Sequence, residues 1–155
     1  SLRIIRFTIL LCDFIGAYTY KAGLDPLQKI KVLNTRMQIH NLVSSIIYGE
    51  SSLVNHIDRA FHNICIAELY CEAGDGENAI NYVEKATQDA MHHIDVMDQT
   101  DENGNNYVPW PTQRNLCWIL WEDYLMKPQF DIIRKDERFI KCFDLIKSHS
   151  KELKQ

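Results

Sequence analysis

The chain has 155 residues, of which 46% are hydrophobic and 25% charged, a composition that supports one compact domain with a hydrophobic core. Only six Gly and four Pro interrupt it, too few for the many tight turns of a β-sandwich or barrel, so an all-α fold is favoured. Residues 49–111 hold two basic and twelve acidic side chains. Because such a segment repels phosphate, direct nucleic-acid contact by this chain is not expected.

Residues 1–48 are predicted to form a first pair of long helices. Apolar residues recur at spacings of three and four from residue 2 to 22, which predicts a mostly buried helix. Arg6 and Asp13 interrupt this apolar run, and no small-residue cleavage site follows it, so neither a membrane span nor a signal peptide is predicted.

The sequence GLDP at residues 23–26 predicts the turn between these two helices. Gly23 can adopt the left-handed conformation that ends a helix, and Asp25 can cap the next one. Pro26 occupies the first helical position, where its missing N–H costs nothing. The second helix is expected to run to residue 48 with Leu27, Leu42 and Ile46 among the residues of its apolar side.

Residues 52–97 are predicted to form a helical hairpin around the sequence GDG. The expected helices cover residues 52–73 and 77–96. Gly74 can terminate the first helix and Asp75 can cap the second, so the chain reverses in few residues and the helices must pack antiparallel.

The last third of the chain is predicted to hold a loop and then short helices. Residues 98–111 lack periodicity and apolar weight, which is typical of a long exposed loop. Residues 112–150 begin with Thr112, the expected cap of an aromatic helix that ends at Pro128. A short bend follows, and Asp136 is expected to cap a last helix.

The cysteines and the first residue bear on the cell compartment and on completeness. The five cysteines are odd in number, widely spaced and mostly among apolar neighbours, so we expect reduced thiols and a cytoplasmic protein. Because the chain begins at Ser1, we expect it to be part of a longer protein.

The hairpin resembles a tetratricopeptide (TPR) unit. A TPR unit has small residues on both helices and an aromatic residue before the turn, although Asn63 stands where the family usually has an aromatic residue. The residues that carry the resemblance are Ala67, Tyr70, Gly74, Asp75, Ala79, Tyr82 and Ala86. A degenerate second unit is expected around Ala17, Tyr20 and Gly23. The resemblance implies a short array of antiparallel TPR-like hairpins, about six helices in all.

The segment from residue 130 to 139 resembles the closing segment of many bacterial TPR arrays. The matching residues are Phe130, Asp131, Ile133, Arg134, Asp136, Arg138 and Phe139. Together with the order of the helices, they make residues 26–148 similar to the C-terminal region of Firmicutes helix-turn-helix regulators of the Xre type. This resemblance implies a homodimer, a peptide or protein ligand, and a DNA-binding part that is not in this chain.

In such an array a peptide groove would lie on the face formed by the first helix of each pair. The residues that we expect to line it are Asn55, Phe61, Asn63, Ile64, Glu68 and Cys71, of which the two asparagines could bond a peptide backbone. The Lys and Asn set with which some TPR domains hold a terminal carboxylate is not recognisable here, so the identity of the peptide is open.

Aromatic residues also cluster before and within the fifth predicted helix. Trp110, Trp118 and Trp121 either cover the core behind them or form a protein contact, because Trp is a favoured interface anchor. The sequence leaves both interpretations open.

No pattern for catalysis, a metal or a cofactor is found. The loop residues Asp101, Asn103 and Gly104 match part of a calcium loop, but that register puts Gln99 and Trp110 at ligand positions. The histidines and cysteines lack metal-ligand spacing, and no nucleophile elbow or phosphate loop is present. We therefore expect no enzyme activity.

The main alternative to the regulator is a free-standing TPR scaffold that recruits a partner protein. A helical enzyme or metal protein is a third class.

Overall fold

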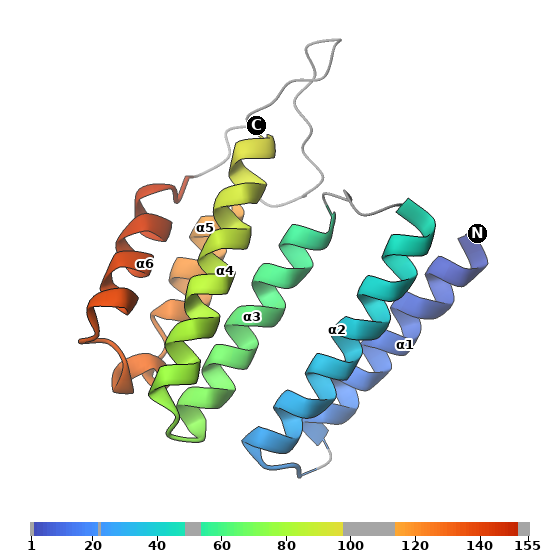
Figure 1. Cartoon of the computed structure of the whole chain (residues 1–155), viewed down its shortest axis with the longest axis horizontal. Coiled ribbons are helices and arrows are strands. Elements are labelled where there is room, and N and C mark those ends of the chain that lie inside the picture. The colour runs from blue at the N-terminus through green and yellow to red at the C-terminus, as the bar shows by residue number, and fades with distance from the viewer. Residues whose placement is uncertain (1, 22, 49–53, 98–113, 152–155) are drawn as a thin grey trace.

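A computed structural model describes residues 2–21, 23–48, 54–97 and 114–151, and within these ranges every regular element is a helix (Figure 1). The elements are α1 (Leu2–Lys21), α2 (Pro26–Tyr48), α3 (Val54–Glu72), α4 (Gly76–Met97), α5 (Leu116–Ile119), the π-helix η1 (Leu120–Leu125), the 3₁₀-helix η2 (Pro128–Ile132) and α6 (Glu137–Ser148). The prediction of an all-α fold with about six helices is confirmed. The predicted loop at 98–111 lies outside the described residues.

The helices stand side by side as three antiparallel pairs, α1 with α2, α3 with α4, and α5–η1 with α6 (Figure 1). The backbone N–H of Asn115 donates to the carbonyl of Lys151 at 3.2 Å, which holds the start of the third pair against its end. Helix α3 packs most extensively on α4, and it also contacts α2, η1 and η2. Helix α3 is therefore the centre of the molecule.

Both predicted turns form as expected. Gly23 and Gly74 have φ angles of +63° and +78°, in the left-handed region that costs a residue with a side chain free energy. The Oδ1 atom of Asp25 accepts the N–H of Gln28 at 2.9 Å, and Gln28 Oε1 accepts the N–H of Asp25 at 3.1 Å. This reciprocal pair starts α2.

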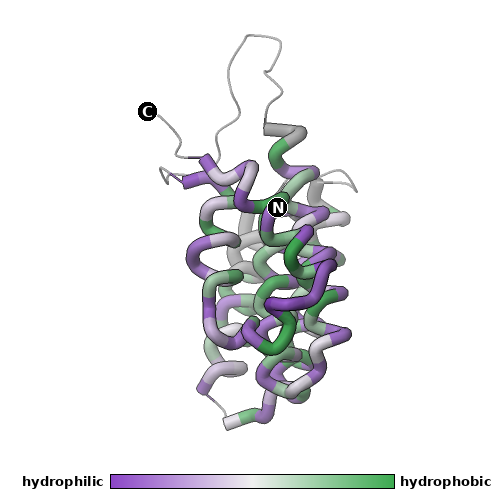
Figure 2. Tube along the Cα trace, turned by 90° about the vertical axis from the view of Figure 1, so that its left-hand side faces the viewer, coloured by the Kyte–Doolittle hydropathy of each residue, from purple (hydrophilic) through white to green (hydrophobic). Residues whose placement is uncertain are grey.

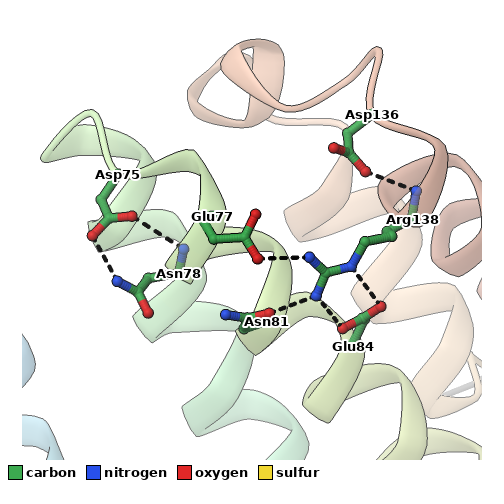
Figure 3. Close-up of polar contacts among 7 residues, drawn as sticks. All are labelled: Asp75, Glu77, Asn78, Asn81, Glu84, Asp136 and Arg138. Carbon is green, nitrogen blue, oxygen red and sulfur yellow. Dashed lines mark hydrogen bonds and ion pairs between the residues drawn. The ribbon is translucent and has the colours of Figure 1, made fainter.

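Asp75 starts α4 in a similar way. Its Oδ1 accepts the backbone N–H of Asn78 at 3.1 Å, and its Oδ2 accepts the Asn78 side-chain amide at 2.7 Å (Figure 3). These bonds lower the pKa of the Asp75 carboxyl, because they favour its charged form. The cap predicted for the second helix of the hairpin is confirmed.

Small residues let α3 and α4 approach closely. Hydrophilic and hydrophobic residues alternate along the helices (Figure 2). Five alanines are fully buried in the shared core: Ala60, Ala67, Ala79, Ala86 and Ala90. Larger side chains from the third pair complete this core: Leu116, Leu120, Leu125, Phe130, Phe139 and Ile146.

The first helix pair is less buried than its sequence predicts. Helix α1 exposes Phe7, Leu10, Phe14 and Tyr18, with Phe14 at 70% of its surface, so the prediction of a mostly buried α1 is wrong. Leu27, Leu42 and Ile46 of α2 are exposed as well, although they were assigned to its apolar side. These side chains are exposed because α1 and α2 lie at one edge of the molecule, and only α2 packs closely on α3.

The aromatic helix begins later and is less regular than predicted. Asn115 is its N-cap, with its side chain accepting the N–H of Trp118 at 2.9 Å. The expected cap, Thr112, lies outside the described residues. After one α-helical turn the backbone widens into η1, a rare geometry that periodicity does not reveal.

The closing segment, residues 130–139, holds α6 against α4. Phe130 and Phe139 are buried and their rings stack with centroids 6.1 Å apart. Arg138 reaches across to α4, where its guanidinium donates to Glu77, Asn81 and Glu84 (Figure 3). These contacts raise the pKa of Arg138 and lower that of Glu84, because each charge stabilises the other. This segment therefore has a structural role.

Candidate ligand groove

A groove runs between α1, α2 and α3 and continues to the loop after η1. Its first compartment has a volume of about 500 Å³, and its second about 320 Å³. Tyr20 and Cys65 line both compartments, so the two adjoin. Along α3 the groove extends from Asp58 to Glu72, a span of about 21 Å at the helical rise per residue.

The first compartment combines apolar walls with a single permanent cation. Its apolar surface comes from Met37 of α2 and Phe61 of α3, among others, whereas Leu33 is only 3% exposed. Arg36 of α2 points into the same space and lies 4.0 Å from the carboxylate of Asp13 on α1, too far for a hydrogen bond. A peptide-sized ligand would meet an apolar surface with one charged anchor there.

Two histidines border this compartment. The imidazole of His62 contacts the Asn34 amide oxygen at 3.1 Å, which ties α3 to α2. Burial, with the nearby positive charge of Arg36, lowers the pKa of His62 to about 4, so this histidine is neutral at pH 7. On the opposite rim, His40 lies 3.2 Å from the Asp58 carboxylate.

An ion pair crosses the second compartment. Lys127, just before η2, contacts both carboxylate oxygens of Glu68 on α3, at 3.0 and 2.8 Å. The same ammonium lies 4.7 Å from the ring centroid of Tyr124. The charge of Glu68 is thus matched, and the pair joins α3 to the third helix pair.

The junction of the compartments does not present a reactive nucleophile. Burial, and next the charge of Glu68, raises the pKa of the Cys65 thiol, and burial raises the pKa of Tyr124 to about 12. Since the thiolate is the nucleophilic form, a thiol with a raised pKa is a poor one.

The structure separates the predicted groove residues into two groups. Phe61 and Glu68 line the groove. Ile64 and Cys71 are buried in the core that α3 shares with α4, so a ligand in the groove would not touch them. Asn63 turns toward α4 and donates to Asp89 at 3.1 Å. The side chain of Asn55 lies outside the described residues.

Several groove residues were not predicted from the sequence. The most prominent are Tyr20 and Arg36 from the first helix pair and Lys127 from the third. Each comes from a different element, far from α3 in sequence. Tyr20 was noted only as part of a degenerate unit, and no local pattern marks Arg36 or Lys127 as ligand-facing.

The aromatic candidates divide in a similar way. Trp121 is half-buried against the core, and Lys147 of α6 lies 5.4 Å from its ring centroid. Trp118 packs edge-on against Trp121, with centroids 6.3 Å apart, and its Nε1 donates to Glu122 at 2.6 Å. This geometry favours Trp121 as a cover of the core and leaves Trp118 at the surface. Trp110 lies outside the described residues.

A polar cluster at the other end of α3 is held together by Asp89 of α4. Its carboxylate receives contacts from His56 at 3.2 Å, Arg59 at 3.1 Å and Asn63. His56 also packs against His92 with ring centroids 4.0 Å apart. Among the described residues, no group of three or more His, Cys, Asp or Glu side chains is arranged to hold a metal ion. We interpret the cluster as a brace between the two helices.

Comparison of the chain with protein-family models, with curated proteins and with solved structures finds no match. In the part of the chain that the structure describes, no helix has both the length and the apolar character needed to cross a bilayer. The geometry of the groove is therefore the basis for assigning a function.

Proposed function

We propose that this chain is a TPR-like domain that binds a peptide or a protein segment in the groove that runs between α1, α2 and α3 to the loop after η1. In this proposal the helix pairs α1–α2, α3–α4 and α5–α6 are three successive hairpins. The first helices of the first two pairs, α1 and α3, then face the groove, as the resemblance to TPR arrays implies, and α2 contributes to its wall. Binding would alter how the outer pair packs on α3, which is a means of transmitting a signal.

The observation that carries the proposal is the length and lining of the groove. A span of about 21 Å matches about six residues of an extended peptide at about 3.3 Å per residue. Apolar side chains such as Phe61 and Met37 can receive alternate side chains of such a peptide, and the polar rim can hydrogen-bond its backbone. A groove of this shape suits a chain molecule better than a compact metabolite.

Tyr20 allows a direct test, because it lines both compartments yet is 60% exposed. Its removal should therefore cost little stability. Tyr18 lies two residues away on the same helix, is 55% exposed and does not line either compartment, which makes it a matched control.

The experiment is affinity selection from a pool of N-acetylated hexapeptides, with mass spectrometry to identify those retained. The native chain and Tyr18→Ala are expected to enrich the same peptides, and Tyr20→Ala to retain them about tenfold less, as for loss of one aromatic contact. Equal retention by both tyrosine variants, or no enrichment by the native chain, would contradict peptide binding in this groove.

We further propose that this binding regulates a helix-turn-helix transcription regulator of the Xre type, with the DNA-binding part outside this chain. The support is the resemblance of the GDG hairpin and of the segment from Phe130 to Phe139, together with the acidic middle of the chain, which is unsuited to DNA. The reading frame upstream of Ser1 tests this step. It should encode a basic helix-turn-helix segment of roughly 60 residues or more; a start codon close to Ser1 would favour a free-standing scaffold instead.

Self-association is the corresponding expectation for the protein in solution. A regulator of this type would act as a homodimer, and light scattering over a range of concentrations measures this directly. A strict monomer at high concentration would weigh against the dimer but not against the groove.

A further inference from the structure

We propose that the groove selects peptides that carry an acidic side chain, Asp or Glu, and that Arg36 is the residue that binds this carboxylate. The inference rests on the proposed peptide-binding function and adds the chemical class of the ligand. Arg36 lies on α2, the second helix of its pair, outside the residues that the sequence pattern assigned to the groove.

Arg36 is held in the first compartment by the helix opposite. Its guanidinium lies against the α1 backbone at Gly16, where a Cβ atom would be 3.7 Å from Cζ. The Cys12 thiol, also on α1, donates to the Arg36 carbonyl at 4.0 Å. The guanidinium is thus positioned in the groove by packing and not by a short ion pair.

Among the described residues, the Arg36 side chain interacts with the Cys12 thiol and makes one long ion-pair contact. Its ion-pair partner among them is Asp13, at 4.0 Å, and the Asp13 side chain is 68% exposed. The Nε atom is buried and has no hydrogen-bond partner in the described ranges. Since a guanidinium is always charged and presents its donors in a planar fork, a carboxylate is the ligand group that matches it best.

The neighbours of Arg36 leave it as the principal positive charge of this compartment. The lining residues that the structure describes there include one arginine and no lysine. His62 is neutral at pH 7, because burial and the charge of Arg36 itself lower its pKa. The Asp58 carboxylate contacts the imidazole of His40. The Asp13 carboxylate could move away from Arg36 into solvent without losing a short hydrogen bond.

The second compartment offers less to an anion. Lys127 is paired with Glu68, and Lys29 lies 6.0 Å from the ring centroid of Tyr20; Glu72 also lines this compartment. Acidic groups there already balance the two lysines. The first compartment also holds the carboxylates of Asp13 and Asp58, but the ion pair of Arg36 with Asp13 is long, at 4.0 Å, whereas Lys127 contacts Glu68 at 2.8 Å. The two compartments thus differ in how closely their cations are paired.

The depth of the guanidinium favours a side-chain carboxylate over a C-terminal one. The Nε atom is buried, whereas the Arg36 side chain as a whole is 36% exposed, so the guanidinium lies partly below the surface. An Asp or Glu side chain can extend to that depth while the peptide backbone stays at the mouth. A terminal carboxylate would have to bring the backbone down with it.

The test uses three hexapeptide pools, all N-acetylated. The first is amidated at its C-terminus and contains Asp and Glu; the second is amidated and lacks them; the third lacks them but has a free C-terminal carboxylate. We expect enrichment from the first pool, with Asp or Glu in every strongly retained peptide. Arg36→Gln should reduce the affinity of these peptides about 10- to 100-fold, as for loss of a charge-assisted pair.

Two more variants guard against a folding defect in Arg36→Gln. Asp13→Asn removes the competing carboxylate from an exposed position, and it is expected to tighten binding of acidic peptides while leaving the helix content unchanged. Arg36→Glu should exchange the preference for acidic residues for one for Lys or Arg. Lys141→Gln, which removes one positive charge from the exposed side of α6, is the control and should bind as the native chain does.

The outcomes distinguish this inference from the function on which it rests. Equal enrichment from the first two pools, unaffected by Arg36→Gln, would support peptide binding and overturn the role of Arg36. Enrichment from the third pool alone would overturn the choice of a side-chain carboxylate. Absence of enrichment from all three pools would contradict peptide binding itself.

Discussion

Arg138 of α6 donates two hydrogen bonds to Glu84 of α4, from Nε to Oε1 at 3.0 Å and from Nη2 to Oε2 at 2.6 Å (Figure 3). The same guanidinium also donates to Glu77 and Asn81, so one side chain from the last helix holds one face of α4. A planar fork that reaches several acceptors fixes orientation as well as distance. Arg138 therefore sets how the third helix pair docks on the second.

Replacement of Arg138 by Lys should lower the melting temperature, although the charge is kept. A lysine cannot make the paired contact with Glu84 or reach all three partners at once. We expect a decrease on the order of 5 °C by differential scanning calorimetry. Lys141→Arg, an exchange of the same two residue types at an exposed position of α6, is the control; a decrease of equal size there would contradict the docking role.

The same pair predicts the direction of an acid effect. The hydrogen bond from Arg138 lowers the pKa of Glu84 below its usual value of 4.5. A carboxyl with a lowered folded-state pKa contributes stability above the unfolded-state pKa, and the contribution is lost as the pH falls below about 4.5. Urea unfolding at pH 6 and pH 3 should show a smaller loss in Glu84→Gln than in the native chain.

The stacked rings of the closing segment should dominate the core of the third pair. Phe139 is buried between Phe130 and Phe143, with centroids 6.1 Å from each, whereas the adjacent Ile140 is 44% exposed. Phe139→Ala is expected to cost about 3–5 kcal/mol of unfolding free energy, through lost burial and the cavity left behind. Ile140→Ala should change it by less than about 1 kcal/mol. Similar losses in the two variants would contradict the assigned core.

The hairpin turn between α3 and α4 depends on a left-handed residue. Gly74 has a φ of +78°, and a Cβ there would meet nothing within 4 Å, so the cost of a side chain is purely conformational. Gly74→Ala should reduce stability by about 1–2 kcal/mol, and Gly74→Asn by less, because Asn tolerates this region better. Chemical denaturation measures both; an alanine variant as stable as the native chain would show that the turn relaxes.

His62 should make the groove sensitive to acid. Its pKa is about 4 in the folded chain, against 6.5 when exposed, so between these values the unfolded state binds the extra proton. Stability from the neutral imidazole is therefore present above about 6.5 and lost as the pH falls toward about 4. His62→Gln should weaken this dependence relative to the native chain, and two identical pH profiles would contradict the burial of His62.

The helices and turns could be predicted from the sequence because their signals are local. Gly23, Asp25, Gly74 and Asp75 determine where helices stop and start through their own conformations and hydrogen bonds, without help from distant residues. The irregular η1 segment could not be predicted because periodicity does not reveal a π-helix. The cap at Asn115 is stabilised in part by a distant contact, since its side-chain amide also donates to the carbonyl of His149.

The groove was predicted only in part because α3 is surrounded on several sides. Ile64 and Cys71 share a stripe that packs on α4, while Ile66 packs toward α2, and Phe61 and Glu68 face the groove. Periodicity marks all these faces as helical but does not say which neighbour covers each one. For the same reason the apolar periodicity of α1 predicted a buried helix, whereas the neighbouring helices determine how much of its apolar surface is covered.

The proposed binding function can be tested most directly by hydrogen exchange of the native chain with and without a hexapeptide selected from the pools. Bound peptide should slow exchange in residues 12–20 of α1 and 58–72 of α3, which line the groove, and leave α6 unchanged. Slowed exchange confined to α6 or to the α4 face, with α1 and α3 unaffected, would contradict the groove as the binding site.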